Sequence, residues 1–402
     1  MSLPKTHTHP SPLQTLAPNL LPHLPNSLAL LRRLQFHHHS PSAHVIATFP
    51  PSFTTIPPED SFSAAYVDRS VAPETECWIF STYETAGSIR RDGMCNGASE
   101  EDGEQERYAA KSHLLALLQA IAHLPPTTDP PEPLMILGAF PETLLPGLLG
   151  GQELQPQNVI SRKLDPCRGG SGEERKRGCV LDNISKPYMK WLIYTNISAG
   201  EETNRGKGEE TLPQGYFYSE LKRGELKLVI SRTDIPKTEE DLARLGHVGV
   251  RYTPAPEGGN QNRDIIKRDD APLIAWSFIK SDGSLSTLHV EPAHRGKGIA
   301  KAISSRLFTQ LARSPREMGF RPVGVPSASD KDGAVDGQER DPSLGLAHSD
   351  VAVDNLESAG VARGLGGREG WGVRWVSVDL RRVEGAVGGV EGGMGEVKKY
   401  MR

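Results

Sequence analysis

The chain has 402 residues, of which 37% are hydrophobic, and this length favours about two to three domains over a single core. Its 41 glycines and 32 prolines fall short of the composition of a wholly disordered chain but predict long loops. The 46 Lys and Arg residues are outnumbered by 50 Asp and Glu residues, giving a formal net charge of -4, which excludes a global positive field for binding nucleic acid.

Targeting and metal signals are weak throughout the sequence. Four cysteines, at 77, 95, 167 and 179, have neither the paired spacing of a zinc site nor the density of a secreted disulfide framework, and we interpret them as reduced thiols. The consecutive histidines at 37–39 would point in different directions, so no metal site is expected there. No stretch of about 18 apolar residues is present, and the polar N-terminus lacks a signal-peptide pattern. We expect a cytoplasmic or nuclear protein without a membrane partner.

The N-terminal half alternates helix-like and strand-like patterns. Helices are predicted over 27–36, 108–124 and 141–149, and strands over 45–49, 65–68, 76–83, 134–140 and 188–194. We interpret 1–44 as an N-terminal extension and 45–200 as a degenerate α/β domain. Two polar inserts, near 87–106 and 155–178, lack apolar spacing and are expected to be poorly ordered. Residues 201–210 are the expected linker.

The C-terminal half predicts strands near 216 and over 248–252, 273–280 and 285–290, with helices over 222–231, 239–245 and up to 312. Asp282-Gly283 is a tight-turn signal, so the strands on either side should be antiparallel. A strand and helix follow at 350–358. The domain is expected to span 211–382, with a mobile insertion at 314–349 and a Gly-rich tail at 383–402.

The clearest chemical signal lies directly after the strand 285–290. There the chain passes through Arg295, Gly296, Lys297 and Gly298 into an amphipathic helix. A helix start offers unpaired N–H groups and a positive dipole end, and glycines let the backbone approach an anion closely. The segment is therefore a candidate phosphate-binding loop.

Two nucleotide-binding motifs do not fit this loop. A P-loop requires G-x-x-x-x-G-K-[ST], which is absent, and the dinucleotide fingerprint requires a third glycine that Gly296-Lys297-Gly298 lacks. The sequence instead contains R-x-x-G-x-A, at Arg295, Gly298 and Ala300, and here it resembles the GNAT superfamily of N-acetyltransferases. In that superfamily the motif holds the pyrophosphate of acetyl-CoA.

The resemblance covers about 211–382, and the glycine N-acyltransferase-like subgroup is the most similar. Besides the R-x-x-G-x-A motif, the resemblance rests on Ala275-Trp276-Ser277-Phe278, the strand end at 288–292, the strand and helix at 350–358, and Leu365-Gly366-Gly367. It implies a mixed, mostly antiparallel sheet flanked by helices (α+β), preceded by a degenerate domain of similar type. It also implies acetyl-CoA, or another acyl-CoA, as cosubstrate, bound by Leu288, His289, Val290, Arg295, Gly296, Lys297, Gly298, Ile299, Ala300, Lys301, Asn355 and Ser358.

The same resemblance implies direct attack of an amine on a thioester, with the amine carried by a small molecule or a peptide. His289 and Glu291 are the nearest titratable side chains and share one strand face, so either is a candidate general base. Packing alone could also account for both residues. Many members carry a tyrosine acid where this chain has Ala362, so no general acid is transferred from the family.

Three functional classes stay open at this point. The first is an acyl-CoA-dependent N-acyltransferase. The second is a non-catalytic protein of the same fold that binds CoA or a partner protein, and the third is a nucleotide- or phosphosugar-binding protein that uses the same loop. Neither the oligomeric state nor the identity of the acceptor follows from the sequence.

Overall fold

A computed structural model describes residues 2–388, apart from 53–54, 58–59, 73, 85–99, 130, 150–178, 196–210, 234, 236, 255–269 and 324–340. The chain forms two compact units. Unit 1 comprises Met1–Leu34, His38–Met189 and Trp371–Arg402, and unit 2 comprises Gln35–His37 and Lys190–Gly370. Among the described residues, no helix combines the length and the apolar character needed to cross a bilayer.

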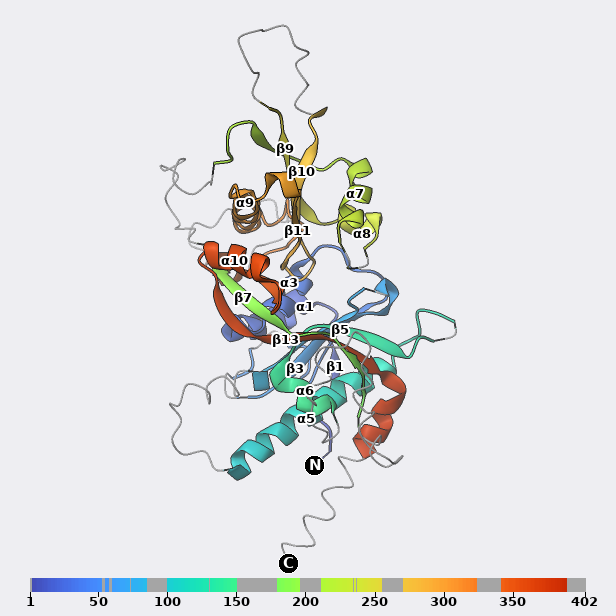
Figure 1. Ribbon diagram of the computed structural model, residues 1–402. Helices are drawn as coiled ribbons and strands as arrows, with labels where there is room; N and C mark the ends of the chain where they lie inside the picture. Colours follow the sequence, from blue (N-terminus) through green and yellow to red (C-terminus); the bar gives the residue numbers. More distant parts are fainter. Residues whose placement is uncertain are drawn as a thin grey trace, which may run out of the picture. The chain divides into compact units, whose positions relative to one another are not determined.

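Unit 1 is built around a mostly antiparallel sheet (Figure 1). Its strands are β1 (His7–Thr8), β2 (Ala43–Ala47), β3 (Ser63–Asp68), β4 (Cys77–Ser81), β5 (Leu134–Pro141), β6 (Leu181–Ile184) and part of β13 (Arg368–Asp379). They are ordered β1-β2-β3-β4-β5-β13, with β6 also paired to β13. Within this set only β4 and β5 pair in parallel, at Cys77 and Leu137.

The helices of unit 1 are α1 (Pro12–Thr15), α2 (Ala17–Leu20), α3 (Leu28–Gln35), α5 (Glu100–Ala122) and α6 (Leu145–Leu148), with 3-10 turns η1 (Leu21–His23), η2 (Arg69–Val71), η3 (Glu142–Leu144) and η10 (Leu380–Arg382). The apolar stripe of α5 packs into the same buried cluster as α6, β4 and β5, through Leu114, Leu118, Leu137 and Leu148. Burial of this stripe is the main reason for a helix here, since α5 begins with a run of charged residues.

Several boundaries in unit 1 differ from the sequence-based expectation. Residues 1–34 belong to unit 1, where β1 pairs with β2, whereas an extension was expected. Helix α5 begins at Glu100, inside the insert expected at 87–106. The expected tail is helical at 383–388, and Val383 and Val387 are buried in the core. Strand β13 was not predicted at all. The insert 155–178 and the linker 201–210 lie outside the described residues.

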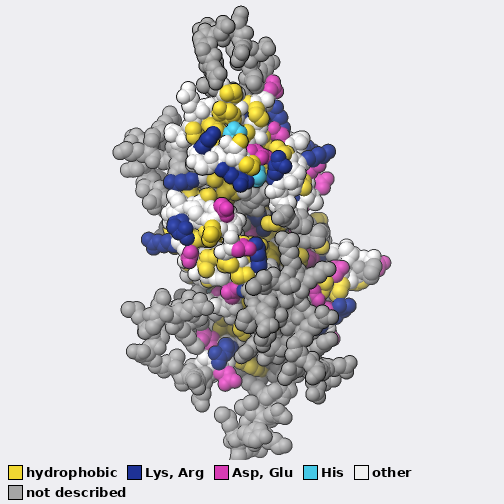
Figure 2. Space-filling model, viewed as in Figure 1, with side chains coloured by type: hydrophobic (Ala, Val, Ile, Leu, Met, Phe, Trp, Pro, Cys, Tyr) yellow, Lys and Arg dark blue, Asp and Glu magenta, His cyan; other side chains and the backbone are white. Residues whose placement is uncertain are grey.

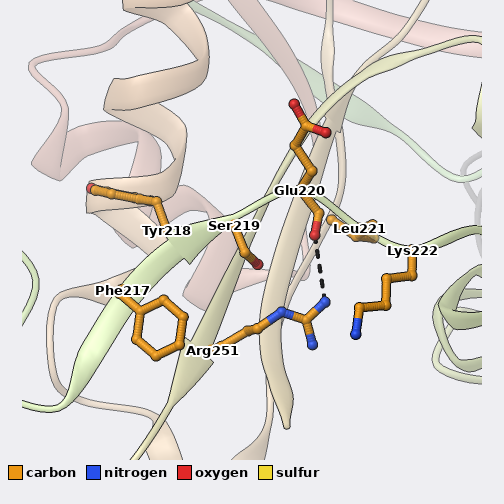
Figure 3. A pocket seen from close by; sticks show the side chains of 7 residues that line it. All are labelled: Phe217, Tyr218, Ser219, Glu220, Leu221, Lys222 and Arg251. Atoms are coloured by element: carbon orange, nitrogen blue, oxygen red, sulfur yellow. Dashed lines mark hydrogen bonds between the residues drawn. The ribbon is translucent and has the colours of Figure 1, made fainter. Parts of the chain in front are cut away.

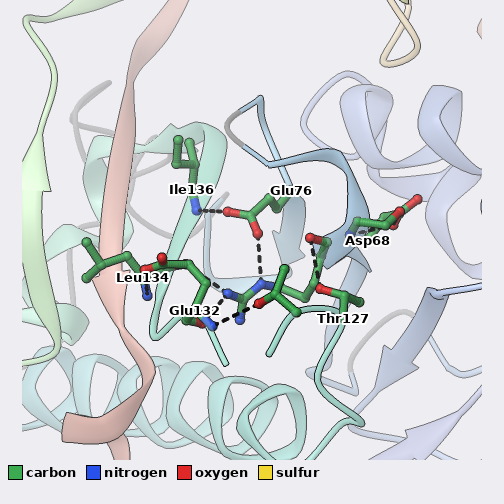
Figure 4. A network of polar contacts seen from close by, with 9 residues as sticks. Asp68, Glu76, Thr127, Glu132, Leu134 and Ile136 are labelled. Atoms are coloured by element: carbon green, nitrogen blue, oxygen red, sulfur yellow. Dashed lines mark hydrogen bonds and ion pairs between the residues drawn. The ribbon is translucent and has the colours of Figure 1, made fainter. Parts of the chain in front are cut away.

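A polar network holds the start of the parallel pair in unit 1 (Figure 4). The Glu76 carboxylate accepts from Arg69 Nε at 2.8 Å and from the Ile136 amide at 2.9 Å. Arg69 also donates to the carbonyl of Leu134 at 2.9 Å. Burial raises the pKa of Glu76, although the Ile136 amide and Arg69 oppose this rise. The network therefore ties β4 to β5 through side chains as well as backbone.

Unit 2 contains a four-stranded antiparallel sheet, ordered β11-β10-β9-β8. Its strands are β8 (Tyr216–Ser219), β9 (Gly246–Tyr252), β10 (Leu273–Ile279) and β11 (Leu285–Val290), and its helices are α7 (Leu226–Ser231), α8 (Glu239–Ala243), α9 (Ile299–Arg313) and α10 (Leu356–Gly364). The 3-10 turns are η6 (Arg223–Glu225), η8 (Pro292–His294) and η9 (Pro342–Gly345). Strand β12 (Leu346–Ala352) is not part of this four-stranded sheet and lies beside β7 (Tyr188–Tyr194).

The two faces of the four-stranded sheet carry different helices (Figure 1). Trp276 and Phe278 of β10 are buried with Leu226 of α7 and Leu242 of α8, which defines the α7/α8 face. Helix α9 covers the opposite face, where Arg306 lies over the ring of Tyr218. The Asp282-Gly283 turn joins β10 to β11 as predicted, with Gly283 at φ 78° and the two strands antiparallel.

The expected fold class is confirmed, since both units combine mostly antiparallel sheets with flanking helices. The insertion expected at 314–349 is partly wrong. Residues 341–349 form η9 and the first part of β12, where Asp341 caps η9 by accepting from the Ser343 amide. Residues 324–340 lie outside the described residues.

Candidate functional site

The predicted loop lies between β11 and α9 and is exposed at 295–298. Gly296 and Gly298 have φ angles of 74° and 78°, in the left-handed region that favours glycine. A Cβ added at either position would meet nothing within 4 Å. The glycines are therefore required by the backbone conformation, and the space in front of the loop is open to a ligand.

Two cationic side chains of the loop fold back onto its surroundings. Arg295 Nε donates to the carbonyl of Val290 at 2.9 Å, and Lys297 Nζ donates to the Tyr216 hydroxyl at 2.8 Å. The same hydroxyl lies 2.9 Å from His294 Nδ1. These contacts fix the loop against β8 and the end of β11, and they draw the Arg295 and Lys297 side chains onto the protein.

The first turn of α9 presents those amides. Gly298 is the N-cap residue, and among the described residues no side chain caps this helix. The first N–H groups of a helix have no acceptor within the helix, and the helix dipole makes this end electropositive. The amides of Ile299, Ala300 and Lys301 can therefore bind an anion of the size of a phosphate group.

Strand β11 has an open edge beside this loop. It pairs with β10 on one side, while on the other side the described contact with β12 is an isolated parallel bridge between Ser284 and His348. Beyond this bridge the two strands belong to different sheets. Thr287 adopts a φ of 54°, and the register with β10 shifts between Trp276 and Phe278, so β11 is bulged where it leaves β12.

The ladder also fixes which groups face the open edge. The Glu291 amide donates to the carbonyl of Ile274 at 2.8 Å. Because backbone groups alternate along an antiparallel pair, the amide of the preceding residue, Val290, points away from β10. Val290 is thus the candidate amide donor at this edge, within the predicted stretch 288–290.

The two predicted base candidates lie together on the α7/α8 face. His289 Nε2 is 3.6 Å from Glu291 Oε1, too long for a hydrogen bond, and Arg232 Nε donates to the same oxygen at 3.0 Å. Burial lowers the pKa of His289, with Glu291 opposing this change. Glu291 is half-buried, and although burial opposes the change, Arg232 lowers its pKa below the usual range. Of the two, neutral His289 is the better proton acceptor near neutral pH.

Helix α10 places the remaining predicted residues. Asn355 Oδ1 accepts from the Ser358 amide at 3.0 Å and so caps this helix, which makes its observed role structural. Ser358 is half-buried in the first turn. Ala362 is buried in the last turn and offers only a methyl group, so it cannot donate a proton.

Sequence reasoning missed Tyr216 and Arg232, because each reaches the site from a distant element. Tyr216 begins β8 and contacts His294 and Lys297, and Arg232 directly follows α7. No local motif marks either residue. The register of β8 on β9, and the end of α7 beside β11, would have been needed to find them.

A separate pocket of about 470 Å³ lies beside β8 on the α7/α8 face (Figure 3). It is lined by Phe217, Tyr218, Ser219, Glu220, Leu221, Lys222 and Arg251. The Arg251 guanidinium already pairs with both carboxylate oxygens of Glu225 at 2.8 Å and donates to the Ala271 carbonyl. It contains none of the predicted site residues, and we assign it no ligand.

Charge and metal-binding groups add little to this site. On the face shown in Figure 2, acidic and basic side chains are interspersed over the described surface. Within the described ranges, no group of three or more His, Cys, Asp or Glu side chains is able to hold a metal ion. Cys77 and Cys179 are buried cysteines that form no disulfide among the described residues, and burial raises the pKa of Cys77. Cys95 and Cys167 lie outside the described residues.

Comparisons with known proteins agree with an acyltransferase. Residues 3–191, slightly less than half of the chain, match the family described as the acyl-CoA N-acyltransferase verG N-terminal domain. No curated protein matches the chain. The matched region corresponds mainly to unit 1, whereas the loop at 295–298 lies in unit 2.

Three solved structures resemble this chain to a limited extent. A Drosophila malonogaster protein has a TM-score of 0.45 at 12% identity, covering 90% of this chain and 95% of its own. A GCN5-related N-acetyltransferase from Sphaerobacter thermophilus has a TM-score of 0.39 at 10% identity, covering 94% and 97%. A tandem GNAT protein from the clavulanic acid biosynthesis pathway has a TM-score of 0.36 at 11% identity, covering 92% and 93%. TM-scores below 0.5 do not establish a common fold. The family match supports acyl-CoA N-acyltransferase activity in general.

Proposed function

We propose that this protein is an acyl-CoA-dependent N-acyltransferase of the glycine N-acyltransferase-like subgroup, working in the cytoplasm or nucleus. It moves an acyl group, in our proposal acetyl, from a CoA thioester to the amine of a small molecule or peptide. The observation that carries this proposal is the open edge of β11, which runs directly into a glycine loop with open space at the Cβ positions of Gly296 and Gly298. An extended thioester arm and its pyrophosphate need these two features side by side.

The residues present fit CoA at both features. Amides of 299–301 bind the pyrophosphate at the start of α9, and Gly296 and Gly298 keep side-chain atoms out of that space. The edge of Leu288–Val290 pairs with the pantetheine arm. When bound, CoA supplies the activated acyl carbonyl, and the protein supplies position and proton transfer.

His289 is the proposed base. It takes a proton from the acceptor ammonium, and the free amine then attacks the thioester carbonyl carbon. The Val290 amide donates to the oxygen that becomes negative in this step. Glu291, paired with Arg232, orients the imidazole by facing Nε2, so that Nδ1 is the basic atom. The C–S bond then breaks and CoA leaves as the thiolate, which receives through solvent the extra proton that the attacking nitrogen still carries.

A second function, CoA binding without catalysis, is favoured by Ala362. This buried methyl group stands where many related enzymes carry the tyrosine acid. Incubation of the full-length protein with acetyl-CoA and a panel of small amines and peptides, with release of free thiol as the readout, separates the two functions. Tight acetyl-CoA binding without amine-dependent thiol release would support the non-catalytic function.

Calorimetry decides the ligand class independently of turnover. We expect acetyl-CoA and CoA to bind and to compete with each other, while ATP competes only weakly. A stronger response to ATP or to a phosphosugar than to CoA would favour the nucleotide- or phosphosugar-binding class and overturn the proposal.

A further inference from the structure

Trp276 of β10 stands directly beneath the proposed base. It is the register partner of His289, and the two rings stack with centroids 4.6 Å apart and an interplanar angle of 19°. The Trp276 side chain is fully buried, at 0% exposure. It is packed against Leu226 and Val229 of α7 and Leu242 of α8. One face of the imidazole is therefore covered by a fully buried indole.

Packing alone does not account fully for this tryptophan. Its Nε1 is buried without a hydrogen-bond partner among the described residues. A buried N–H that stays unpaired is unfavourable, whereas phenylalanine would fill most of the same space without one. The indole differs from phenylalanine in a second way, since its face attracts cations more strongly.

The charged groups around His289 leave its cationic form poorly supported. Directly after the strand, Glu291 attracts an imidazolium, but Arg232 at the end of α7 pairs with that carboxylate at 3.0 Å. Arg295, from the loop, disfavours a second positive charge, and burial does the same. A base must nevertheless carry the positive charge briefly after it accepts a proton.

We propose that Trp276 is a positioning residue that stabilises the imidazolium form of His289 through its indole face. The ring lies within the distance of about 6 Å at which a cation over an aromatic face is attracted. It adds this support without introducing a further negative charge, which would bind the acceptor ammonium in competition. The inference rests on the proposed function, because only a base at His289 needs its protonated form stabilised.

The direct test is the pKa of His289, measured by NMR from its Cε1 proton in the full-length protein. Trp276→Phe retains an aromatic ring and should lower this pKa, and Trp276→Leu should lower it further, by about 0.4 to 1.5 pH units. Phe278→Leu is the matched control. Phe278 is buried in the same cluster on the same strand, but its recorded ring contact is with His247. The control should lose stability without changing the pKa of His289.

A shape-preserving variant keeps the test independent of how well the Leu variant folds. Replacing tryptophan by fluorinated tryptophans weakens the ring's attraction for cations with little change in volume. The pKa of His289 should fall stepwise with each added fluorine, and the acid limb of kcat/KM should move with it.

Failure of this inference and failure of the proposed function give different results. An unchanged or raised His289 pKa in both Trp276→Phe and the fluorinated proteins would overturn the role of Trp276. If instead that pKa shifts as expected but His289→Ala retains the parent turnover, the stacking effect is real and the assignment of the base is wrong.

Discussion

Both units contain the same order of elements, a hairpin followed by a helix and a strand, but the last strand pairs differently in the two units. In unit 1 the hairpin β3–β4 is followed by α5 and then by β5, which is parallel to β4. In unit 2 the hairpin β10–β11 is followed by α9 and then by β12, which meets β11 in a parallel bridge. Strand β4 is buried at four of its five residues, whereas every residue of β11 is only half-buried.

The difference shows what an open strand edge contributes. In unit 1 the Glu76 network and the ladder keep β4 and β5 in one sheet, and the shared core lies against them. In unit 2 the strands part beyond Ser284 and His348, and the glycine loop follows at the end of β11. The same arrangement thus serves stability in one unit and, in our proposal, cofactor binding in the other.

The largest expected effect follows from replacing the proposed base, His289, on the open strand β11. His289→Ala should reduce kcat/KM by about 10²- to 10⁴-fold, the usual contribution of a general base, with a small change in melting temperature. The matched control is His113→Ala on α5 of unit 1. That histidine is also half-buried and lies 3.1 Å from Thr48 Oγ1, so its loss should affect stability but not rate.

The pH profile sharpens the same experiment. His289 acts as a base only when neutral, so the rate should fall as the pH drops through its pKa. Because Glu291 raises the pKa of His289, Glu291→Gln should move the acid limb to lower pH. If His289→Ala and Glu291→Gln both keep the parent rate and profile, the base lies elsewhere, in the segment 236–245 or in the long loop 314–349.

The next effect tests whether the paired strands β4 and β5 of unit 1 serve stability alone. Glu76→Ala removes the carboxylate that accepts from Arg69 Nε and from the Ile136 amide, and loss of one member of a buried ion pair costs about 3 to 5 kcal/mol. We expect a loss of this order in urea unfolding, with unchanged acyl-CoA affinity in the folded protein. Glu76→Gln, which can still accept from Ile136, should lose less. A parallel loss of acyl-CoA affinity would show that unit 1 also contributes to the binding site.

A smaller effect is expected at the loop itself. Gly298→Val forces a β-branched residue into a φ of 78°, at a strain of about 1 to 3 kcal/mol, and places its side chain where the phosphate is proposed to lie. We expect acyl-CoA affinity to fall about 10- to 100-fold by calorimetry. Gly366→Val is the control, since Gly366 has a φ of 76° and equally open surroundings outside the loop. Equal affinities in the two variants would contradict the loop assignment.

The sequence predicts the local parts of this structure well. The helix of 299–313 and the strands flanking Asp282-Gly283 have strong periodicity or turn chemistry, and they lie within a few residues of their expected positions. Strand β13 was missed because its sequence, Arg-Glu-Gly-Trp-Gly-Val, lacks simple alternation at its start. Its place is set by long-range pairing with β5, which no local pattern reveals.

The candidate site likewise contains residues that a local motif predicts and contacts that depend on the tertiary structure. Arg295, Gly298 and their neighbours form one continuous motif and could be named from the sequence. The contacts of Arg232 with Glu291, and of Trp276 with His289, depend on register and on the end of α7. Likewise the opening between β11 and β12 is a property of two sheets, and it cannot be read from either strand alone.

The smallest predicted effect concerns the point where β11 and β12 part. His348 is fully buried, and burial together with the neighbouring Lys190 ammonium lowers its pKa from 6.5 to about 4. Its Nδ1 lies 3.3 Å from Lys190 Nζ and its Nε2 lies 2.9 Å from the carbonyl of Asp282. Lys190 also donates to Asp350 at 2.6 Å. Neutral His348 thus accepts from Lys190 and donates to the turn before β11.

The sign of the pH effect follows from these contacts. Between pH 6.5 and about 4 the unfolded chain binds a proton at His348 that the folded chain does not, so stability decreases as the pH falls, by about 1.4 kcal/mol per unit at most. Above that window His348 has no effect. His348→Gln, which keeps a donor and an acceptor without titrating, should remove this slope in urea unfolding between pH 6.5 and 5.

Acyl-CoA affinity should also weaken with acid in the parent but less in this variant, because the network holds β11 and β12 at the point where they part. His113→Gln in unit 1 should remove a slope of the same sign, since burial lowers the pKa of His113 as well, yet leave the pH dependence of acyl-CoA affinity unchanged. If both variants alter the affinity profile equally, the acid response comes from global unfolding and not from the junction of β11 and β12.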